Sequence, residues 1–516
     1  MAQALPAGST VAVIGSGAMG AGIAEVVAAA GYTVKLFDTG IGAVDKAIGW
    51  IGAQYARSVE DGRMQAADAG AARARLRRAA SLKEVDDADL VVEAIVENLD
   101  VKRMLFAELE GVVADDCILA TNTSSISVTA IAAQLMRPER LVGMHFFNPV
   151  PRMELVEVIS GLATSAEVAD TVFATAAAWG KQPVHARSTP GFIVNRVARP
   201  YYAEALRLLS ERAADVATID ALLREAGGFR MGPFALMDLI GHDVNLAVTR
   251  SVFEAHYGDP RFAPSVIQQE LVDAGYLGRK SGRGFYVHGE HAREPAASTE
   301  APQPHPGSVS ISIDPGITHA PTAPMERRLA AAGIKIGHRK PLPGAGQHEA
   351  PALHCHGAAI FLTDGRSATE RARANNHPDT VLYDLCAEDA SRIALARADQ
   401  CGEAAWMATV GLFQAAGFAV TRIDDVPGMA VMRTVAMLAN EAADAVNQGV
   451  CSAAAVDLAM RKGVNYPHGP LAWAEQIGLD QVVTVLANLA ASYGEERYRV
   501  SPLLRRKVAG GGRFHG

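Results

Sequence analysis

Residues 10–24 read TVAVIGSGAMGAGIA, and they indicate how the chain folds at its start. Residues 10–14 form an apolar, β-branched run that is typical of a buried strand. In the segment that follows, Gly15 permits a tight turn, Gly17 lets the backbone approach a pyrophosphate, and Gly20 lets a helix pack closely against the strand. The pattern predicts a strand, a turn and a helix whose amino end holds a dinucleotide.

A second strand-like run, residues 33–37, ends at an acidic residue, Asp38. Dinucleotide sites carry a carboxylate about 20 residues after the glycines, where it accepts hydrogen bonds from the ribose hydroxyls. Asp38 would repel a 2′-phosphate, and neither Thr39 nor Gly40 is basic, so the sequence favours NAD over NADP. The predicted contacts of the cofactor in this region are Gly15, Ser16, Gly17, Ala18, Met19, Gly20 and Asp38. The alternative interpretation is that the glycines only turn a loop.

The pattern of short apolar runs and helical stretches continues to about residue 147, and it predicts an α/β domain. We expect a Rossmann-like, doubly wound parallel sheet with crossover helices. Residues 43–80 are too many for one crossover helix and predict an inserted helical hairpin, whose Arg73, Arg75, Arg77 and Arg78 are expected on a solvated face. Past Pro190 the apolar spacing becomes helical, which predicts a separate all-α domain.

The second half of the chain repeats the first at one constant offset in residue number. Pro190, Gly191, Arg196, Glu204, Gly232 and Asp243 match Pro427, Gly428, Arg433, Glu441, Gly469 and Asp480. No second glycine-rich turn precedes these matches, and Met432 stands where the first copy has Asn195. The sequence therefore predicts a degenerate tandem copy and one active site per chain.

The predicted domain boundaries follow from these changes of pattern. They are an NAD-binding Rossmann-like domain (8–188), an all-α domain (189–287), a linker rich in Pro and Ala (288–325), a degenerate Rossmann-like segment (326–423) and a second, non-catalytic all-α domain (424–516).

Composition excludes several classes of partner. The formal net charge of −8 gives no basic surface for nucleic acid or an acidic membrane, and no apolar run reaches the length of a membrane span. The five cysteines are scattered, which is typical of reduced thiols, so we expect a cytoplasmic protein. His348, His354, Cys355 and His356 fit no familiar zinc spacing, and we expect a polar loop and no metal.

One histidine is a candidate for proton transfer. His145 ends a strand-like run, which predicts a position at the carboxyl edge of the parallel sheet, where such sheets bind ligands. Glu157 follows in the run MELVEVI, and a buried carboxylate there could hold the imidazole and stabilise its protonated form. The alternative is a core histidine bonded to a carbonyl, since spacing alone does not show contact. A dinucleotide loop together with a general base predicts an NAD-dependent dehydrogenase.

Six motifs, taken in order, resemble the L-3-hydroxyacyl-CoA dehydrogenase family. They are GSGAMGAGIA (15–24), EAIVENLDVK (93–102), TNTSS (121–125), HFFNPVPRMELVEVI (145–159), TPGFIVNR (189–196) and LGRKSGRGFY (277–286). The resemblance implies oxidation of an L-3-hydroxyacyl-CoA to a 3-ketoacyl-CoA with NAD. It implies a catalytic set of His145, Glu157, Ser124 and Asn195. It also implies that the NAD site includes Glu97, Lys102, Asn122, Ser124, Asn148 and Lys280.

The chain departs from the family in its hairpin, which has no lysine past Lys46, so the contacts of CoA stay open, with Arg57 as one candidate. The long tandem architecture resembles a bacterial branch of the family that is associated with phenylacetate breakdown, which implies 3-hydroxyadipyl-CoA as substrate; 3-hydroxybutyryl-CoA stays open. A dicarboxylyl chain needs a cation at its far end, and Arg196, Arg199 and Arg230 are the candidates.

The resemblance also bears on assembly. Single-copy members of the family dimerise through their all-α domains, so the second copy is expected to supply that partner surface as an internal pseudo-dimer. A homo-oligomer stays open. A protein of the same fold can also bind nucleotides or serve a structural role without catalysis, and this remains the alternative function.

Overall fold

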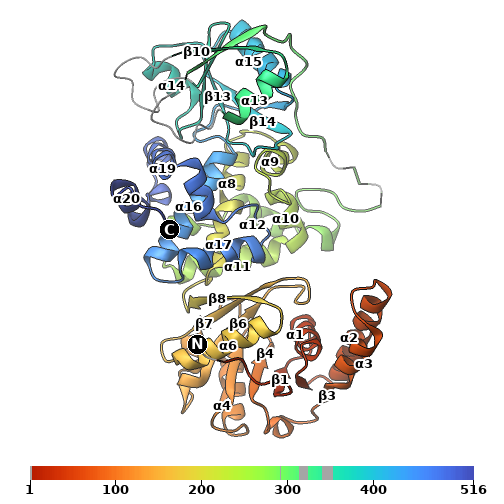
Figure 1. The fold of residues 1–516 in the computed structure, drawn as a ribbon. Helices are drawn as coiled ribbons and strands as arrows, with labels where there is room; N and C mark the ends of the chain where they lie inside the picture. Colours follow the sequence, from red (N-terminus) through yellow and green to blue (C-terminus); the bar gives the residue numbers. More distant parts are fainter. Residues whose placement is uncertain (1–2, 291, 294, 313–322, 340–351, 516) are drawn as a thin grey trace. The chain divides into compact units, whose positions relative to one another are not determined.

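The computed structural model describes residues 3–290, 292–293, 295–312, 323–339 and 352–515. The chain divides into two compact units (Figure 1). Unit 1 consists of Met1–Arg196 and Gln448–Val464, and unit 2 of Val197–Asn447 and Asn465–Gly516. In the described residues, no helix has the length and apolar character needed to cross a membrane.

Unit 1 is built on an eight-stranded sheet of order β3-β2-β1-β4-β5-β6-β7-β8. The strands are β1 (Thr10–Ile14), β2 (Thr33–Phe37), β3 (Leu76–Arg78), β4 (Leu90–Glu93), β5 (Ile118–Thr121), β6 (Leu141–Phe146), β7 (Leu155–Ser160) and β8 (Gln182–Arg187). The sheet is parallel from β3 to β6, and β7 runs antiparallel to β6. This order confirms the predicted doubly wound sheet. Strands β3, β7 and β8 were not predicted from the sequence.

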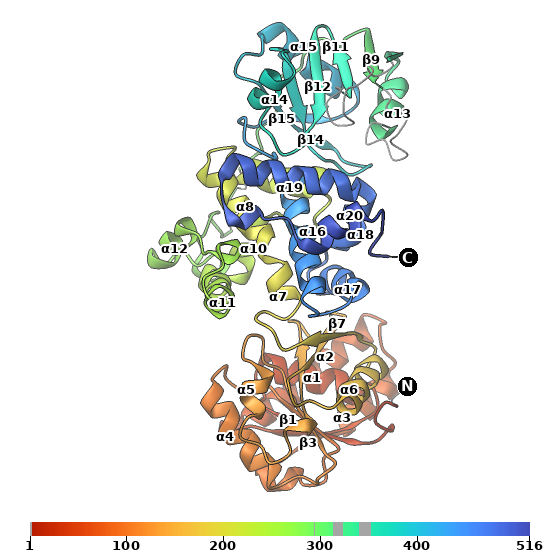
Figure 2. The same ribbon diagram turned by 90° about the vertical axis from the view of Figure 1, so that its left-hand side faces the viewer.

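Helices cover both faces of this sheet (Figure 2). In unit 1 they are α1 (Ala18–Ala29), α2 (Ala43–Glu60), α3 (Ala66–Ala74), α4 (Leu99–Glu110), α5 (Val128–Ala132), α6 (Ala166–Ala178) and α17 (Ala453–Gly463), with short helices η1 (Leu82–Val85) and η2 (Pro138–Arg140). A hydrophobic core lies between the sheet and helices α1 and α6. In this core the ring of Trp179 contacts the rings of Tyr32 and Phe146.

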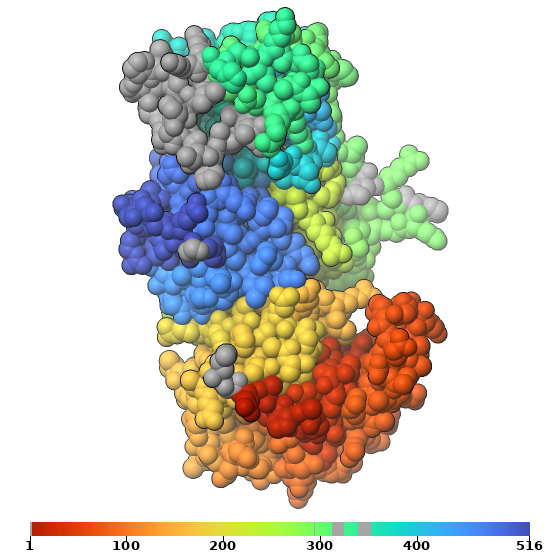
Figure 3. All heavy atoms as spheres, in the orientation of Figure 1, coloured from red at the N-terminus to blue at the C-terminus, as the bar shows by residue number. Residues whose placement is uncertain are grey.

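The predicted hairpin is present as α2 and α3, and it stands at one side of unit 1 (Figure 3). It is anchored to α1 by buried Ile51 and Tyr55, whose hydroxyl donates to the Glu25 carbonyl at 2.6 Å. Of its arginines, Arg73, Arg77 and Arg78 are exposed, whereas Arg75 is half-buried and donates to the carbonyl of Ala28.

Unit 2 contains a second, seven-stranded sheet of order β10-β9-β11-β12-β13-β14-β15. Its strands are β9 (Ser308–Ser312), β10 (Lys335–Arg339), β11 (Leu353–Cys355), β12 (Ala358–Leu362), β13 (Thr380–Tyr383), β14 (Arg392–Arg397) and β15 (Ala419–Arg422). Helices α13 (Ala323–Ala331), α14 (Ala368–Ala374) and α15 (Glu403–Ala415) pack on it. The sheet is mixed, because β11 is antiparallel to both of its neighbours and β13 is antiparallel to β14.

The predicted linker, 288–325, needs a correction. Residues 308–312 of this stretch form β9, which pairs with β10 and β11 inside the second sheet. Further upstream, the amide of Glu300 donates to the Val420 carbonyl, and the amide of Ser298 donates to the Thr218 hydroxyl. The linker prediction was wrong for these residues, because a composition poor in large apolar groups does not prevent a strand from pairing with an existing sheet edge.

The remaining helices of unit 2 form the two all-α copies. The first copy has α8 (Arg199–Ser210), α9 (Val216–Ala221), η3 (Leu222–Ala226), α10 (Pro233–Ile240), α11 (His242–Ala255), η4 (Pro260–Phe262), α12 (Val266–Asp273) and η5 (Arg279–Ser281). The second has α16 (Val431–Asn447), α18 (Pro470–Ile477), α19 (Leu479–Tyr493), η6 (Glu496–Tyr498) and α20 (Pro502–Ala509).

The structure repeats at the offset found in the sequence. At that offset the first residues of β7, α6 and α10 correspond to the first residues of β14, α15 and α18. The second sheet keeps the antiparallel and then parallel pairing of β6, β7 and β8 in β13, β14 and β15. These matches confirm the tandem copy with a degenerate second sheet.

Candidate active site

The glycine-rich turn has the geometry that a dinucleotide loop requires. Gly15 has φ +97°, and a Cβ there would lie 2.6 Å from the Ala94 carbonyl oxygen. A Cβ on Gly20 would lie 1.8 Å from the Gly15 carbonyl oxygen, so both positions need glycine for packing. A Cβ on Gly17 would meet no protein atom within 4 Å. Gly17 therefore keeps open a space beside the amino end of α1, which is where a pyrophosphate binds.

Asp38 follows β2 and reaches this turn. Its Oδ2 accepts hydrogen bonds from the amide of Ser16 at 2.7 Å and from the Ser16 hydroxyl at 2.8 Å, and its Oδ1 accepts one from the amide of Gly40. Burial favours the neutral acid, but these donors outweigh it and hold the pKa of Asp38 below its usual range. The side chain is an ionised acceptor at the loop, which fits a ribose with free hydroxyls.

His145 and Glu157 form a buried hydrogen-bonded pair. They lie directly opposite each other in the antiparallel register of β6 and β7, and His145 Nδ1 is 2.7 Å from Glu157 Oε2. His145 is 5% exposed and Glu157 is fully buried. Because the carboxylate accepts the proton on Nδ1, the other nitrogen, Nε2, carries the lone pair of the neutral ring. The predicted contact between His145 and Glu157 is therefore present.

Glu157 also fixes the start of the next element. Its Oε1 accepts hydrogen bonds from the amides of Ile193 at 2.9 Å and Val194 at 3.0 Å, at the amino end of α7 (Val194–Val197). Asn195 lies on this short helix, and its amide donates to the carbonyl of Ser124 at 3.4 Å. One carboxylate therefore orients the His145 ring and the backbone that carries Asn195.

Ser124 lies in a loop that Glu97 organises. Glu97 Oε1 accepts hydrogen bonds from the hydroxyl of Thr123 at 2.6 Å and from the amides of Ser124 and Ser125. Burial would raise the pKa of Glu97, but the Thr123 hydroxyl, the Lys102 ammonium group and the loop amides together lower it. Glu97 is thus held ionised, and it fixes the loop that presents Ser124.

Glu93 ends β4 and is fully buried, and it was not predicted from the sequence as a site residue. Lys102 Nζ lies 2.6 Å from Glu93 Oε1 and 3.3 Å from Glu97 Oε2, and the Thr121 hydroxyl donates to Glu93 Oε2 at 2.6 Å. A buried lysine is tolerated only with such partners. The available signal was a glutamate at the end of the apolar run LVVE, a position that normally excludes charge.

Most of the predicted residues meet at one edge of the sheet. The turn follows β1, Asp38 follows β2, Glu97 follows β4, Asn122 and Ser124 follow β5, and His145 lies near the end of β6. These five strands are parallel, so their carboxyl ends share an edge. Asn122 accepts a hydrogen bond from the amide of Phe146 at 2.9 Å. His145 and the glycine-rich turn are therefore on the same edge of one sheet, where α/β proteins bind ligands.

The other predicted residues have separate surroundings. Asn148 is exposed in the loop after β6. Lys280 belongs to unit 2, where its Nζ lies 2.6 Å from Asp243 Oδ2, so the structure does not bring it to the other cofactor residues within one unit. Arg57 is exposed on α2. Of the suspected metal cluster, His354 and Cys355 lie on β11 with His356 in the following turn, and His348 lies outside the described residues.

Comparison with known families accounts for most of the chain. The NAD binding domain of 3-hydroxyacyl-CoA dehydrogenase matches residues 10–189, and the C-terminal domain of that family matches residues 191–288 and again residues 428–514. A reduced Rossmann-fold domain of 3-hydroxybutyryl-CoA dehydrogenase matches residues 360–427.

Individual relatives agree with these matches. The chain is 45% identical to a 3-hydroxyadipyl-CoA dehydrogenase of Escherichia coli strain K12 over 97% of both proteins. It is 41% identical to a probable 3-hydroxybutyryl-CoA dehydrogenase of Bacillus subtilis, which covers 54% of this chain and 96% of that protein. A crystal structure of a 3-hydroxybutyryl-CoA dehydrogenase from E. coli K12 superposes with a TM-score of 0.87 over 98% of this chain and 99% of the other, at 43% identity. The chain therefore belongs to the 3-hydroxyacyl-CoA dehydrogenase family, as an NAD-dependent oxidoreductase of 3-hydroxyacyl-CoA thioesters.

Proposed function

We propose that His145 is the general base of this oxidation and that Glu157 is its positioning residue. The observation that carries the proposal is the buried 2.7 Å contact between His145 Nδ1 and Glu157 Oε2. Nε2 takes the proton of the substrate hydroxyl, and the neighbouring carboxylate stabilises the imidazolium that forms. NAD, when bound, supplies the acceptor for the hydride from C3 of the acyl chain.

The substrate oxygen needs hydrogen-bond donors as its charge changes. The Ser124 hydroxyl and the Asn195 amide are the donors we assign to it, because they are linked to each other and to the dyad by the contacts of α7 and the Glu97 loop. Fixed donors of this kind stabilise a developing oxyanion without reorganisation. The same arrangement holds the oxygen at a constant distance from the base.

The residues at the cofactor loop fit NAD. Gly17 leaves open space, α1 has no acidic residue in its first turn, and Asp38 is held ionised. We assign Gly15, Ser16, Gly17, Ala18, Met19 and Gly20 to the pyrophosphate and Asp38 to the ribose. Glu97, Lys102, Asn122, Asn148 and Lys280 are assigned to the rest of the cofactor site.

We propose 3-hydroxyadipyl-CoA as the preferred substrate and 3-hydroxybutyryl-CoA as the second candidate. The first is supported by the relative that matches 97% of the chain, and the second by the solved structure with a TM-score of 0.87. The test is steady-state kinetics of NADH formation with both thioesters. A kcat/KM at least about tenfold higher for the dicarboxylyl substrate supports the first, since one buried charge contact contributes about that factor or more.

Catalysis itself has a simple control. Mixing the protein with NADH and acetoacetyl-CoA is expected to give a steady decline of NADH absorbance. A protein that only binds the nucleotide gives no steady decline, and that result would contradict the proposed function.

We further propose that the second copy acts as an internal partner of the first. In unit 1 the amide of Arg187 donates to the Val450 carbonyl, and Arg196 donates to the side chain of Gln448 at 2.9 Å. In unit 2 the residues related to these by the repeat make the reciprocal contacts. The amide of Asp424 donates to the carbonyl of Ala213, and Arg433 donates to Glu211. Reciprocal contacts of this kind are the mark of an isologous interface between two identical subunits.

The proposal predicts that the full chain is a monomer in solution, because its own second copy occupies the surface that a partner would use. Light scattering over a wide concentration range checks this. A dimer whose formation is abolished by the charge reversal Glu211→Lys would contradict an internal partner.

A further inference from the structure

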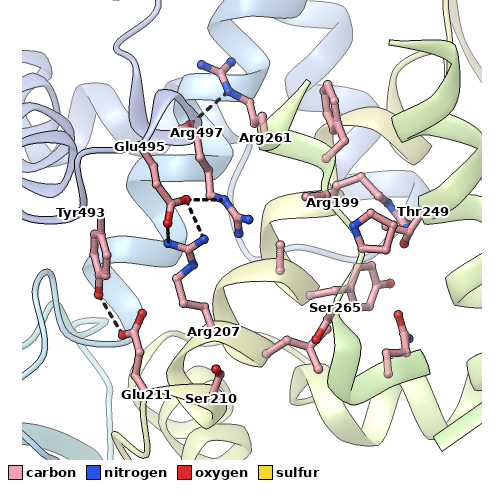
Figure 4. Close-up of a pocket in the computed structure, with 17 residues that line it drawn as sticks. Arg199, Arg207, Ser210, Glu211, Thr249, Arg261, Ser265, Tyr493, Glu495 and Arg497 are labelled. Atoms are coloured by element: carbon pink, nitrogen blue, oxygen red, sulfur yellow. Dashed lines mark hydrogen bonds and ion pairs between the residues drawn. The ribbon is translucent and has the colours of Figure 1, made fainter. Parts of the chain in front are cut away.

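A cavity of about 310 Å³ lies within unit 2 between α8, η4, α12 and the segment around η6 (Figure 4). Four arginines and two glutamates line it, namely Arg199, Arg207, Arg261, Arg497, Glu211 and Glu495. The rest of the lining includes Tyr202, Ala203, Leu206, Phe262, Ala263 and Pro264. The cavity is thus cationic on one part of its wall and apolar on another, and its volume lies within the range of small-molecule sites.

Most of the charges in this cavity already have partners. Arg207 makes two hydrogen bonds to Glu495, Arg261 contacts Glu441 and Asp444, and Glu211 accepts from Arg433 and from the Tyr493 hydroxyl. Glu204, behind the wall, is paired with Arg433. Arg497 lies 3.6 Å from Glu495, and its Nε is buried without a hydrogen-bond partner.

Arg199 is the exception. It is 6% exposed, and within the described residues no carboxylate lies at ion-pair distance from its guanidinium group. Its Nη1 donates to the Thr249 hydroxyl at 3.0 Å, its guanidinium carbon lies 4.9 Å from the centroid of the Tyr202 ring, and its Nε has no partner. Burial lowers the pKa of Arg199, and the neighbouring Tyr202 and Tyr466 oppose this shift in part. Thr249 and Tyr202 are neutral at ordinary pH, so they do not balance the charge of Arg199, and a bound anion would stabilise it.

The three arginines that the sequence suggested for a dicarboxylyl chain are now distinguishable. Arg196 is bonded to Gln448 within unit 1, and Arg230 is exposed. Arg199 is the one of the three that lines this cavity, as Figure 4 shows with its guanidinium group beside Thr249. Guanidinium groups recognise carboxylates through paired hydrogen bonds, and the neighbouring apolar wall suits a short methylene chain.

We propose that this cavity binds a carboxylate on a short aliphatic chain, with Arg199 as its counter-charge. The carboxylate has two possible sources, a dicarboxylyl acyl-CoA or a free dicarboxylate. The first source rests on the proposed function, and the second does not.

The experiment compares the full-length protein with Arg199→Met, which removes the charge and keeps most of the volume. The control is Arg230→Met, which removes an exposed arginine. Kinetics are measured with 3-hydroxyadipyl-CoA and 3-hydroxybutyryl-CoA, and binding of free adipate is measured by calorimetry. If the substrate is the source, Arg199→Met raises KM for the dicarboxylyl thioester by about tenfold or more and changes KM for the butyryl thioester less than about twofold. If a free dicarboxylate is the source, both substrates respond alike, and adipate binds the wild type but not Arg199→Met.

Two further readouts separate this role from a structural one. The melting temperature of Arg199→Met without ligand is expected to equal or exceed that of the wild type, because an unpaired buried charge has been removed. Thr249→Val removes the hydroxyl that accepts the hydrogen bond from the Arg199 guanidinium group. It should give the same kind of change as Arg199→Met, by a smaller factor. Equal kinetics with both substrates, together with adipate binding that does not distinguish Arg199→Met from the wild type, would overturn the proposal. If the wild type turns over neither thioester, the proposed function fails, and the adipate measurement still decides the role of the cavity.

Discussion

Among single residues, Glu157 makes two separate sets of contacts, one with each of its carboxylate oxygens. Oε2 holds the His145 ring and Oε1 caps the start of α7. A substitution that keeps shape but removes charge should therefore affect chemistry more than folding. Gln at this position can still accept the two backbone amides, but it cannot stabilise an imidazolium.

We expect Glu157→Gln to lower kcat by a factor on the order of 10² to 10⁴, because the base loses the group that orients it and stabilises its charged form. The dissociation constant of NAD should stay close to the wild-type value. A kcat close to that of the wild type would show that Glu157 does not act through His145.

The sequence predicted His145, Glu157 and the loop residues, but it could not show that they touch. Contact depends on the antiparallel register of β6 and β7, which places residues 145 and 157 opposite each other. Glu93 was missed for a related reason, because its partner Lys102 lies on the helix that follows β4 and the bond forms only in the folded unit. Pairings of this kind are set by tertiary packing, which local patterns do not record.

At the scale of elements, the helix cap shows how the second copy has changed. In the first copy Glu157 on β7 caps α7, whereas Ala394 stands at that place on β14. In the second copy Asp384, just after β13, accepts hydrogen bonds from the amides of Ala430, Val431 and Met432 instead. The second copy therefore keeps a carboxylate cap, supplied by a different residue, but it has no counterpart of the pair His145 and Glu157.

This cap makes stability depend on pH. Burial raises the pKa of Asp384 to about 6, although the amides of the cap oppose the rise. For an acid with a raised pKa, the stabilising protonated form is present at pH below about 4 and is lost as the pH rises through about 6. The free energy of unfolding of Asp384→Asn, taken relative to that of the wild type, should therefore rise by up to about 3 kcal/mol between pH 4 and pH 7.

Denaturant unfolding of Asp384→Asn and of the wild type at pH 4 and at pH 7 checks this expectation. Asp389→Asn, at an exposed position, is the control and should show no such change. A difference between Asp384→Asn and the wild type that stays constant with pH would contradict the assignment.

Helix α17 of the second copy lies against β7 and β8 of unit 1. A Cβ on Gly463 would lie 2.6 Å from Leu155 Cδ2 and 3.0 Å from Val194 Cγ2, close to Glu157 and Asn195 in the chain. Gly463→Leu is expected to lower kcat by about tenfold or more, because overpacking displaces the strand and helix that carry these residues. The matched control is Ala226→Leu, at the corresponding position of the first copy and buried in unit 2. Equal kcat losses in the two variants would show that the effect is general destabilisation.

Most of the elements missed in the sequence analysis share a physical cause. Strands β3, β8 and β9 are short or polar, and each pairs with a neighbour that is far away in the chain or was itself not predicted. Strand β7 does not share this cause, because it is apolar and pairs with the nearby strand β6. By contrast β1, β2, β4, β5 and β6 are central and apolar, so their own residues identify them. The local sequence of α17 does not indicate that this helix packs on unit 1. The constant offset between the two copies was the one feature of the sequence that related to it.

In the whole molecule, the second copy keeps packing contacts of the first copy but lacks its candidate catalytic residues. Leu382, Ala394 and Met432 stand where the first copy has His145, Glu157 and Asn195. The reciprocal contacts persist all the same, as in the pair Arg261 with Glu441 and its counterpart Tyr498 with Glu204. Buried polar contacts of this kind are costly to break, so they are retained when catalysis is not.

The chain should therefore bind one NAD. Calorimetric titration of the full-length protein is expected to give a stoichiometry of one per chain, and Gly20→Val should abolish it, because a Cβ there meets the Gly15 carbonyl. A second equivalent of NAD that survives Gly20→Val would contradict a single site.

We propose that the imidazole of His145 takes the proton at the sheet edge where NAD binds. His145→Gln tests this, with turnover of the hydroxyacyl-CoA and affinity for NAD measured on the same preparation. We expect kcat to fall by a factor on the order of 10² to 10⁴ or more, while the dissociation constant of NAD changes less than about threefold. A kcat close to that of the wild type would show that another group takes the proton.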